Sequence, residues 1–448
     1  MRRSKLAALS LVLGLALTGC GSSGGSTGNT GNTSGTVTPD TPKPEAGITN
    51  LSSQVSKIDV PETPVTKSHG DALAKSGVLL LQKSVELAND NNANYLISPF
   101  SIQMALGMTA AGSDEGSSTE KQMMEVLLPG LSESPSSLNK EMATFAAKME
   151  GDKNVSWNVA NSIWVTNNGA VKLSDSYVAD ATNYYNAELF SAPFNETTRE
   201  AINDWVKQET RERIPKILEN PIDKARIILV NALAFDGKWE TPYGDEDILE
   251  YMEFTNADGT KSKVTYLSSG EAAAFHPAGG LGFIRPYEGG QYSFVGILPP
   301  EGMSTDEYLK KLAADERGFA AAYLASEYTH DVYVRIPEFK TEYGITLDDT
   351  LKALGMTDPY ENASFGKMVS SDSNSVQIST VVHKTMIEVD RTGTKAAAST
   401  AVVQTESAMA GDFIEPYFIY LDRPFIYGIV DNESGVPIFL GVQNSMAE

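Results

Sequence analysis

The pattern of apolar and polar positions divides the chain into three parts. A mostly apolar run occupies residues 6–17, and residues 21–47 consist almost entirely of Gly, Ser, Thr, Asn and Pro. From residue 67 to the end, apolar residues recur without a further low-complexity break, internal repeat or block of charge. This pattern predicts one large folded domain, residues 67–448, preceded by a polar segment that buries too little apolar surface to fold.

Several helices are predicted from capping residues and apolar spacing. Ser98 stands before a proline that suits the first helical position. The sequence Ser-x-x-Glu, typical of a capping box, occurs at residues 117–120 and 304–307. Residues 199–209 and 345–354 have apolar positions with helical spacing, which predicts two further helices.

Strands are predicted mainly in the second half of the chain. Residues 227–235 form a nearly continuous apolar run that suits a strand buried on both faces. Other segments are rich in β-branched or aromatic residues and are bounded by turns: 292–298, 332–336, 417–421 and 425–430. Because helices dominate the first half and strands the second, we expect an α+β fold rather than alternating β-α-β units.

The first twenty residues are predicted to direct export. Arg2, Arg3 and Lys5 precede the apolar run, which is too short to cross a bilayer. The run ends in Leu-Thr-Gly-Cys, which resembles the bacterial lipobox. The resemblance implies that residues 1–19 are a signal peptide and that Cys20 becomes a lipidated N-terminus on the outward side of a bacterial cell envelope. An ordinary signal peptide with an incidental cysteine is the alternative.

Residues 20–66 are expected to form a flexible tether behind the lipidated cysteine. As a random coil this segment spans on the order of 35–40 Å, enough to hold a folded domain clear of a membrane. Residues 48–66 carry scattered Ile, Leu and Val, which fits either a docking strand or a continued linker. The linker is the favoured interpretation.

Charge and cysteine content exclude several classes of partner. The chain has 35 Lys and Arg against 58 Asp and Glu, and removing residues 1–19 changes the net charge from −23 to −23 − 3 = −26. Such an acidic protein is not expected to bind nucleic acid, heparin-like polymers or an anionic lipid surface through its charge. A single cysteine also excludes a disulfide framework and a Cys-based metal cluster.

Enzymatic chemistry is not indicated. The sequence has no G-x-S-x-G elbow, no H-E-x-x-H motif, no Walker loop and no G-x-G-x-x-G after a strand. His69, His276, His330 and His383 are too scattered to form a local metal motif. His383 lies in a strand-like stretch, where a histidine more often satisfies a core hydrogen bond than performs catalysis. We therefore expect no catalytic residue, no metal and no cofactor.

Residues 390–415 are unusual for a loop. Small and β-branched residues follow Gly393, and no proline occurs before residue 416. In an extended strand, the alternate residues that face one way would all be small enough to enter a packed interior: Thr394, Ala396, Ala398, Thr400 and Val402. Composition alone favours a flexible surface loop, so both interpretations stay open.

Residues from about 70 to 445 resemble a serpin through five separated motifs in that family's order. The motifs are NYLISPFSI at 94–102, INDWV at 202–206, NALAFDGKW at 231–239, the stretch 383–398, and DRPF with PIFLG within 422–441. Each motif is weak alone, but together they extend over nearly the whole domain.

The resemblance implies a three-sheet α+β fold with about eight or nine helices and an exposed reactive-centre loop. A protease attacks the loop of such a protein and is trapped as an acyl-enzyme when the upstream arm inserts into the main sheet. Ser98, Asn231 and His383 would lie in the shutter beneath the opening sheet, and Trp239 in the breach at its top. The inserting hinge would comprise Gly393, Thr394, Ala396, Ala398 and Thr400.

The loop departs from the family pattern in two ways. Arg391 stands two residues before the hinge glycine, where inhibitory members usually carry glutamate, and the interval from Gly393 to Pro424 looks longer than usual. Counting from the hinge glycine gives Ser407–Ala408 as the scissile bond, with Met409–Ala410 as the alternative. Small or unbranched residues there indicate elastase-like or subtilisin-like serine proteases, with papain-like cysteine proteases as a second class.

Three functions compete. The favoured one is a monomeric, surface-tethered suicide inhibitor of proteases that is not itself an enzyme. A non-inhibitory serpin acting as a binding or decoy protein is the second; Arg391 supports it, and the uncharged hinge row opposes it. A lipoprotein solute-binding protein is the third, and the missing β-α-β alternation disfavours it. A hydrolase is a distant fourth.

Overall fold

The computed structural model describes residues 47–169, 171–370, 376–394 and 415–446, without the side chains of residues 328–331. The predicted signal peptide 1–19, Cys20 and most of the predicted tether lie outside the described residues.

The main β-sheet has seven strands and carries the predicted hinge. Strand β5, predicted from its apolar run, is buried on both faces along nearly its whole length. It pairs antiparallel with β3 on one side and parallel with β12 on the other. In order across the sheet the strands are β1 (Thr49–Asn50), β4 (Glu188–Ala192), β3 (Val155–Thr166), β5 (Ile227–Lys238), β13 (Gly393–Thr394), β12 (Thr380–Asp390) and β11 (Phe339–Thr346).

The other nine described strands form a second hydrogen-bonded network. Its joint is β7. Along one edge its residues 261–267 pair with β6 and its residues 273–275 pair with β8, while β10 pairs with residues 266–274 along the other edge. Counting the two sides of this joint separately gives the three sheets that were predicted. The strands are β14 (Tyr417–Tyr420), β10 (Glu327–Pro337), β6 (Ile248–Thr255), β7 (Lys261–Phe275), β8 (Leu281–Pro286), β9 (Tyr292–Leu298), β15 (Phe425–Asp431), β16 (Pro437–Gln443) and β2 (Tyr95–Ile97).

Ten α-helices occur among the described residues, against eight or nine predicted, and α8, α9 and α10 are only six residues or shorter. The caps at Ser98, Ser117 and Ser304 are confirmed. The helix predicted at 345–354 is shorter because β11 runs to Thr346. The helices are α1 (Lys67–Ala88), α2 (Pro99–Ala111), α3 (Ser118–Leu127), α4 (Pro135–Gly151), α5 (Asp175–Tyr185), α6 (Glu196–Glu209), α7 (Thr305–Ala313), α8 (Phe319–Leu324), α9 (Asp348–Ala353) and α10 (Asp358–Glu361).

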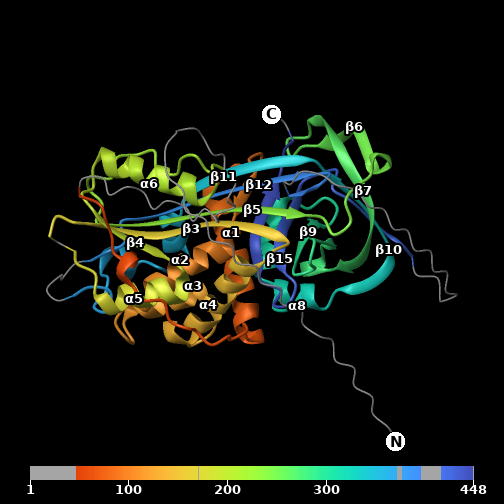
Figure 1. The fold of residues 1–448 in the computed structure, drawn as a ribbon. Helices are drawn as coiled ribbons and strands as arrows, with labels where there is room; N and C mark the ends of the chain where they lie inside the picture. The colour runs from red at the N-terminus through yellow and green to blue at the C-terminus, as the bar shows by residue number, and fades with distance from the viewer. Residues whose placement is uncertain (1–46, 170, 371–375, 395–414, 447–448) are drawn as a thin grey trace, which may run out of the picture. The chain divides into compact units, whose positions relative to one another are not determined.

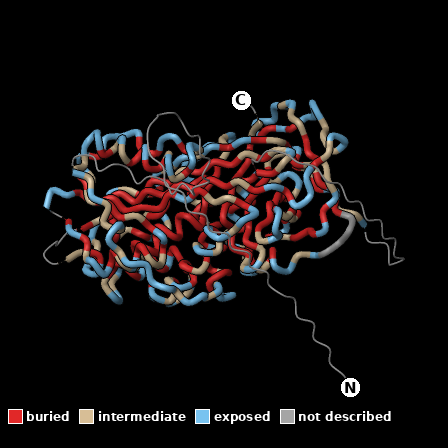
Figure 2. Tube along the Cα trace, in the orientation of Figure 1, coloured by how far each residue is buried: buried red, intermediate tan, exposed pale blue. Residues whose placement is uncertain are grey.

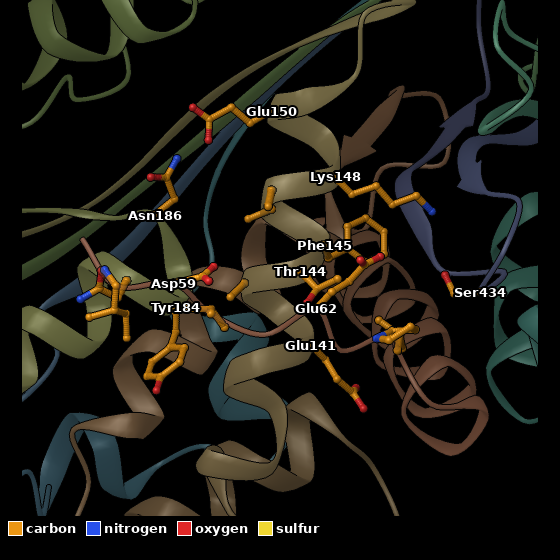
Figure 3. Close-up of a pocket in the computed structure, with 18 of the residues that line it drawn as sticks. Asp59, Glu62, Glu141, Thr144, Phe145, Lys148, Glu150, Tyr184, Asn186 and Ser434 are labelled. Carbon is orange, nitrogen blue, oxygen red and sulfur yellow. The ribbon is translucent and has the colours of Figure 1, made fainter.

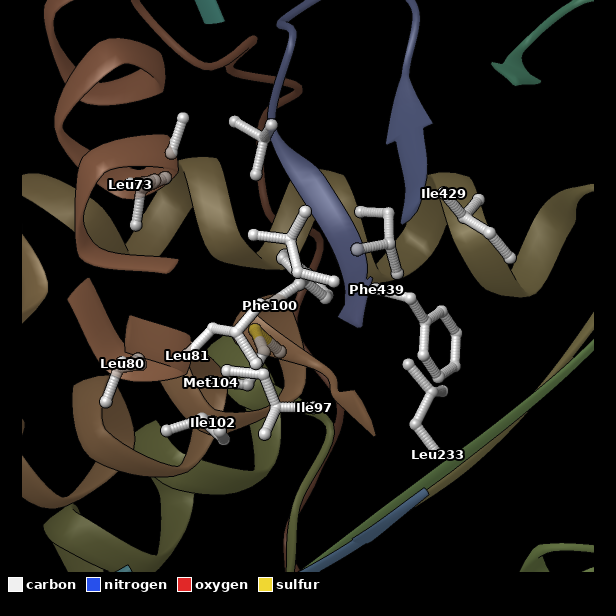
Figure 4. Packing of buried hydrophobic residues seen from close by; sticks show 14 of the residues in the cluster. Leu73, Leu80, Leu81, Ile97, Phe100, Ile102, Met104, Leu233, Ile429 and Phe439 are labelled. Atoms are coloured by element: carbon white, nitrogen blue, oxygen red, sulfur yellow. The ribbon is translucent and has the colours of Figure 1, made fainter. Parts of the chain in front are cut away.

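Helices cover both faces of the main sheet. Helix α6 lies over one face, and α2 to α5 lie on the other (Figure 1). Trp205 of α6 packs edge-on against Trp164 and Phe190 of the sheet in the smaller of two cores. The larger core continues from α1 and α2, which carries the buried Phe100, to the second network, where Phe439 of β16 is buried (Figures 2 and 4). The main sheet is therefore a buried central layer.

Residues 48–66 are part of the folded domain, so the predicted boundary at residue 66 is wrong. Strand β1 pairs with β4, and further along the segment the backbone N–H of Ile58 donates to Asn183 Oδ1 at 3.1 Å. The backbone N–H of Thr63 donates to Thr144 Oγ1 at 2.8 Å. Of the scattered apolar side chains, Ile48 packs against the smaller core, Leu51, Val55 and Val65 pack against the larger one, and Ile58 is exposed.

Residues of this segment and of α4 line a cavity of about 800 Å³ (Figure 3). Lys148 on α4 lines the cavity and donates to Asp431 Oδ1 and Glu433 Oε2, each at 2.9 Å. The segment 48–66 and the turn after β15 thus both contact α4.

Among the helices that the structure describes, none combines the length and the apolar character needed to span a membrane.

Candidate functional site

The structure brings three predicted residues together beneath the main sheet. Ser98 is the N-cap of α2, Asn231 lies on β5, and His383 lies directly beside Asn231 in the register of β5 with β12. The backbone N–H of Ser98 donates to His383 Nε2 at 2.9 Å, and His383 Nδ1 lies 2.8 Å from Asn231 Oδ1. All three side chains are buried.

These contacts fix the protonation of His383. Because Nε2 accepts a hydrogen bond from a backbone N–H, the ring proton sits on Nδ1 and is donated to Asn231 Oδ1. Complete burial lowers the pKa of the His383 imidazole to about 3, so the ring is neutral at physiological pH. A neutral, fully hydrogen-bonded ring indicates a structural connector between two strands.

Sequence reasoning missed two further members of this cluster. Ser101 Oγ donates to Asn231 Oδ1 at 2.7 Å, and Asn231 Nδ2 returns a bond to the Ser101 carbonyl at 2.8 Å. Ser98 Oγ donates to the carbonyl of Ile438 on β16 at 2.7 Å. The cluster therefore connects α2 to β5 of the main sheet and to β16 of the second network. The spacing of Ser98 and Ser101 at the start of one helix was the only sequence signal for the contact of Ser101 with Asn231.

Trp239 closes the top of the same sheet. It is 1% exposed, and its indole N–H donates to the carbonyl of Asp390 at 2.9 Å. Its ring stacks on Tyr287 with centroids 4.8 Å apart, and the Arg285 guanidinium lies 5.0 Å from its centroid. Glu271 pairs with that buried guanidinium. The indole is thus bonded to the strand end that leads into the loop.

The first two hinge residues already lie inside the sheet. Gly393 and Thr394 form β13, which pairs antiparallel with β12 on one side and with β5 on the other. Thr394 is fully buried, and its hydroxyl lies 2.7 Å from that of Tyr287. At Gly393, with φ of 153°, a Cβ would stand 2.1 Å from the Gly237 carbonyl oxygen, so only glycine fits.

Arg391 stays outside the sheet. Its guanidinium pairs with Asp245 at 2.9 Å, and its side chain is 52% exposed, so this ion pair contributes little to stability. Asp390 organises the turn instead, accepting hydrogen bonds from the backbone N–H groups of Thr392 at 2.7 Å and Gly393 at 3.2 Å. The arginine therefore places no charge among the residues that enter the sheet.

The rest of the predicted loop lies outside the described residues. This holds for Ala396, Ala398 and Thr400, and for both candidate bonds, Ser407–Ala408 and Met409–Ala410. The described chain resumes at Glu415, close to the start of β14.

Two other histidines have ordinary structural contacts. His69 lies 2.8 Å from Glu141 in a buried pair, and His276 packs against Tyr417 with ring centroids 5.5 Å apart. Across the residues that the structure describes, no three metal-binding side chains gather in one place.

Comparison with known proteins places this arrangement in a family. The family described as "Serpin (serine protease inhibitor)" matches residues 72–445. The chain belongs to the serpin family. Serpins are generally protease inhibitors rather than enzymes, and the predicted serpin fold is confirmed.

Relatives match over most of their length. Serpin-Z10 of Arabidopsis thaliana is 30% identical over 84% of this chain and 96% of its own. Iripin-5 of Ixodes ricinus is 29% identical over 80% of this chain and 91% of its own. The native-state crystal structure of tengpin, a thermophilic serpin, superimposes with a TM-score of 0.79 at 35% identity, covering 89% of this chain and 100% of tengpin.

Proposed function

We propose that this serpin is a suicide inhibitor that traps proteases by inserting its cleaved loop into the main sheet. The observation that carries the proposal is the burial of Thr394 between β5 and β12. Below it, β5 and β12 pair in parallel. A loop strand between them would be antiparallel to both, as β13 already is, and antiparallel ladders are slightly more stable than parallel ones.

The cluster beneath the sheet opposes this insertion until cleavage drives it. Asn231 and His383 face each other across β5 and β12, so an extra strand there must break their 2.8 Å contact. Trp239 resists at the top through its bond to the Asp390 carbonyl. We assign Ser98, Asn231 and His383 to the shutter and Trp239 to the breach; they control opening and take no part in bond cleavage.

The covalent step uses the chemistry of the target protease. Its serine oxygen attacks the carbonyl carbon of Ser407, forms an ester with that residue and releases the amino group of Ala408. Small or unbranched residues at this bond, or at Met409–Ala410, suit elastase-like and subtilisin-like enzymes. A papain-like cysteine protease would form a thioester at the same carbonyl.

The sequence also supports an outward-facing position on a bacterial cell. A basic head, a short apolar run and Leu-Thr-Gly-Cys precede the polar segment, which suits lipid attachment at Cys20. Mass spectrometry of the mature N-terminus tests this: a diacylglyceryl thioether on Cys20 is expected, and an unmodified cysteine or cleavage elsewhere would contradict it.

The inhibitor proposal is tested by incubating the mature chain with subtilisin, neutrophil elastase and papain and separating the products on denaturing gels. We expect a serine protease to form a complex that survives SDS and boiling, with the new N-terminus at Ala408 or Ala410. A loop that every protease cuts without being trapped would contradict inhibition and support the binding or decoy alternative.

Two variants at residue 394 test whether trapping of the protease depends on insertion of the loop. Thr394→Arg would have to bury an unpaired guanidinium between β5 and β12, so it should be cleaved without trapping the protease. Thr394→Ser keeps the hydroxyl that meets Tyr287 and should trap normally. Equal trapping by both variants would exclude the insertion mechanism.

A further inference from the structure

An exposed aromatic pair lies on the strand that follows the reactive loop. Phe418 on β14 is 56% exposed and Tyr333 on β10 is 48% exposed, and their rings stack with centroids 5.4 Å apart. A neighbouring pair continues the row, because the Arg335 guanidinium lies 4.2 Å from the ring centroid of Tyr420. We call Tyr333, Arg335, Phe418 and Tyr420 the β14 patch.

Strand register explains why these side chains share one face. Tyr333 pairs with Phe418, and Arg335 with Tyr420, in the parallel ladder of β10 and β14. The intervening residues Val334 and Ile419 are buried on the opposite face. The two aromatic pairs thus form adjacent rungs on the outer surface of the sheet.

Neighbouring elements leave the patch uncovered. On the β7 side, Tyr333 is paired with Gly270, which is exposed and adds no side chain. On the other side, β14 is the last strand of its network. Arg335 has no ion-pair partner among the described residues. Exposed aromatic side chains gathered on one face of a sheet are a candidate interaction surface.

The position of the patch along the chain, just after the reactive loop, indicates its partner. Residues 395–414 end only three positions before Tyr417, and the candidate bond Ser407–Ala408 lies within them. Ala408 is 418 − 408 = 10 residues from Phe418, a reach of at most about 35 Å. A protease of ordinary size has a radius of gyration of about 17 Å, which corresponds to a diameter of about 44 Å. This diameter exceeds the reach. The surface of a protease bound at Ser407–Ala408 can therefore reach β14.

We propose that the β14 patch is a docking surface for the target protease before cleavage. It would take an apolar side chain on Tyr333 and Phe418, and a carboxylate on Arg335, from the protease surface beside the active site. Such contacts stabilise the encounter complex without altering the bond that is cut or the insertion that follows. The proposal rests on the inhibitory function and goes beyond it.

The test compares rates of complex formation, using the protease that the wild-type chain traps fastest. Replacing both aromatics, Tyr333→Ser with Phe418→Ser, should lower the second-order rate about tenfold while leaving the number of inhibitor molecules consumed per trapped protease unchanged. Leu87→Ser is the matched control, because Leu87 is 49% exposed at the end of α1, away from β14. It should leave the rate unchanged.

The outcomes separate this proposal from the function on which it rests. If the wild type traps a protease and the double variant does so at the same rate, the docking surface is refuted while inhibition stands. If the double variant melts at a lower temperature, Phe418→Ser alone is used, with about a threefold loss expected. Dimers of the wild type in sedimentation equilibrium that the double variant abolishes would overturn the proposal in favour of a second copy of this chain.

Discussion

At the scale of single residues, the controls on sheet opening are buried polar contacts between strands. His383 and Asn231 join β12 to β5, and Tyr287 meets Thr394 at the first inserted position. Breaking one of these hydrogen bonds inside the protein is costly, because its donor and acceptor would then be buried without partners. Under the proposed function, these contacts would delay the rearrangement until the loop is cut.

His383 gives the protein a defined response to acid. Between pH 6.5 and about 3 the unfolded imidazole binds a proton that the buried ring does not, so stability falls as the pH is lowered. In His383→Asn this titration is absent. The difference in free energy of unfolding between wild type and variant should therefore narrow by on the order of 3 kcal/mol from pH 7.5 to 4.5. Denaturant unfolding at several pH values measures it, and a constant difference would contradict the buried neutral ring.

Sequence reasoning found the residues with strong local patterns and missed those set only by the fold. Ser98, Asn231 and His383 stand in recognisable motifs, and the structure brings them together. Tyr287 is far from Thr394 in the chain, and only the register of β5 with β13 brings the hinge to its hydroxyl. No local pattern around Tyr287 could have predicted that contact.

At the scale of elements, the main difference from the sequence prediction is the segment 48–66. Its apolar residues are too sparse to form a periodic pattern, because only a few of them pack, against two cores that the rest of the chain builds. Strand β1 is only two residues long, below the length at which alternation can be recognised. By contrast, β5 carries a long apolar run, and its position was predicted almost completely.

Removing this segment should destabilise the domain. A chain beginning at residue 59 loses β1, the bond from the Leu51 N–H to the Leu189 carbonyl at 2.8 Å, and the bond from Ile58 to Asn183. We expect the unfolding temperature to fall by about 5 °C, from a loss on the order of 3 kcal/mol. A chain beginning at residue 47 is the matched control and should melt like the longer protein. Equal melting of both truncated chains would show that the docked segment contributes nothing.

At the scale of the whole molecule, the main sheet is arranged to accept another strand. Strands β5 and β12 pair in parallel over seven residue pairs, while β13 has begun an antiparallel alternative above them. The chain belongs to the serpin family, and the insertion that we propose would supply the rest of this strand from the loop. Under the proposed function, the cut loop would complete this antiparallel strand and give a more stable arrangement.

Loop cleavage should raise the unfolding temperature. About ten new ladder hydrogen bonds at about 1 kcal/mol each correspond to a rise on the order of 20 °C. Calorimetry before and after limited digestion with subtilisin measures the change. Thr394→Arg, cut at the same bond, should show a much smaller rise because its arm cannot enter. An unchanged melt of the cleaved wild type would contradict metastability.

The pairing of β1 with β4 has a consequence for aggregation. Without β1, strand β4 would be the outer edge of the main sheet, with a row of open backbone N–H and C=O groups. Such an edge can recruit a strand from another molecule. If the domain is tethered as we propose, a protease that released it by cutting after residue 50 would also expose this edge. A cut before residue 47 would leave β1 in place and the edge covered.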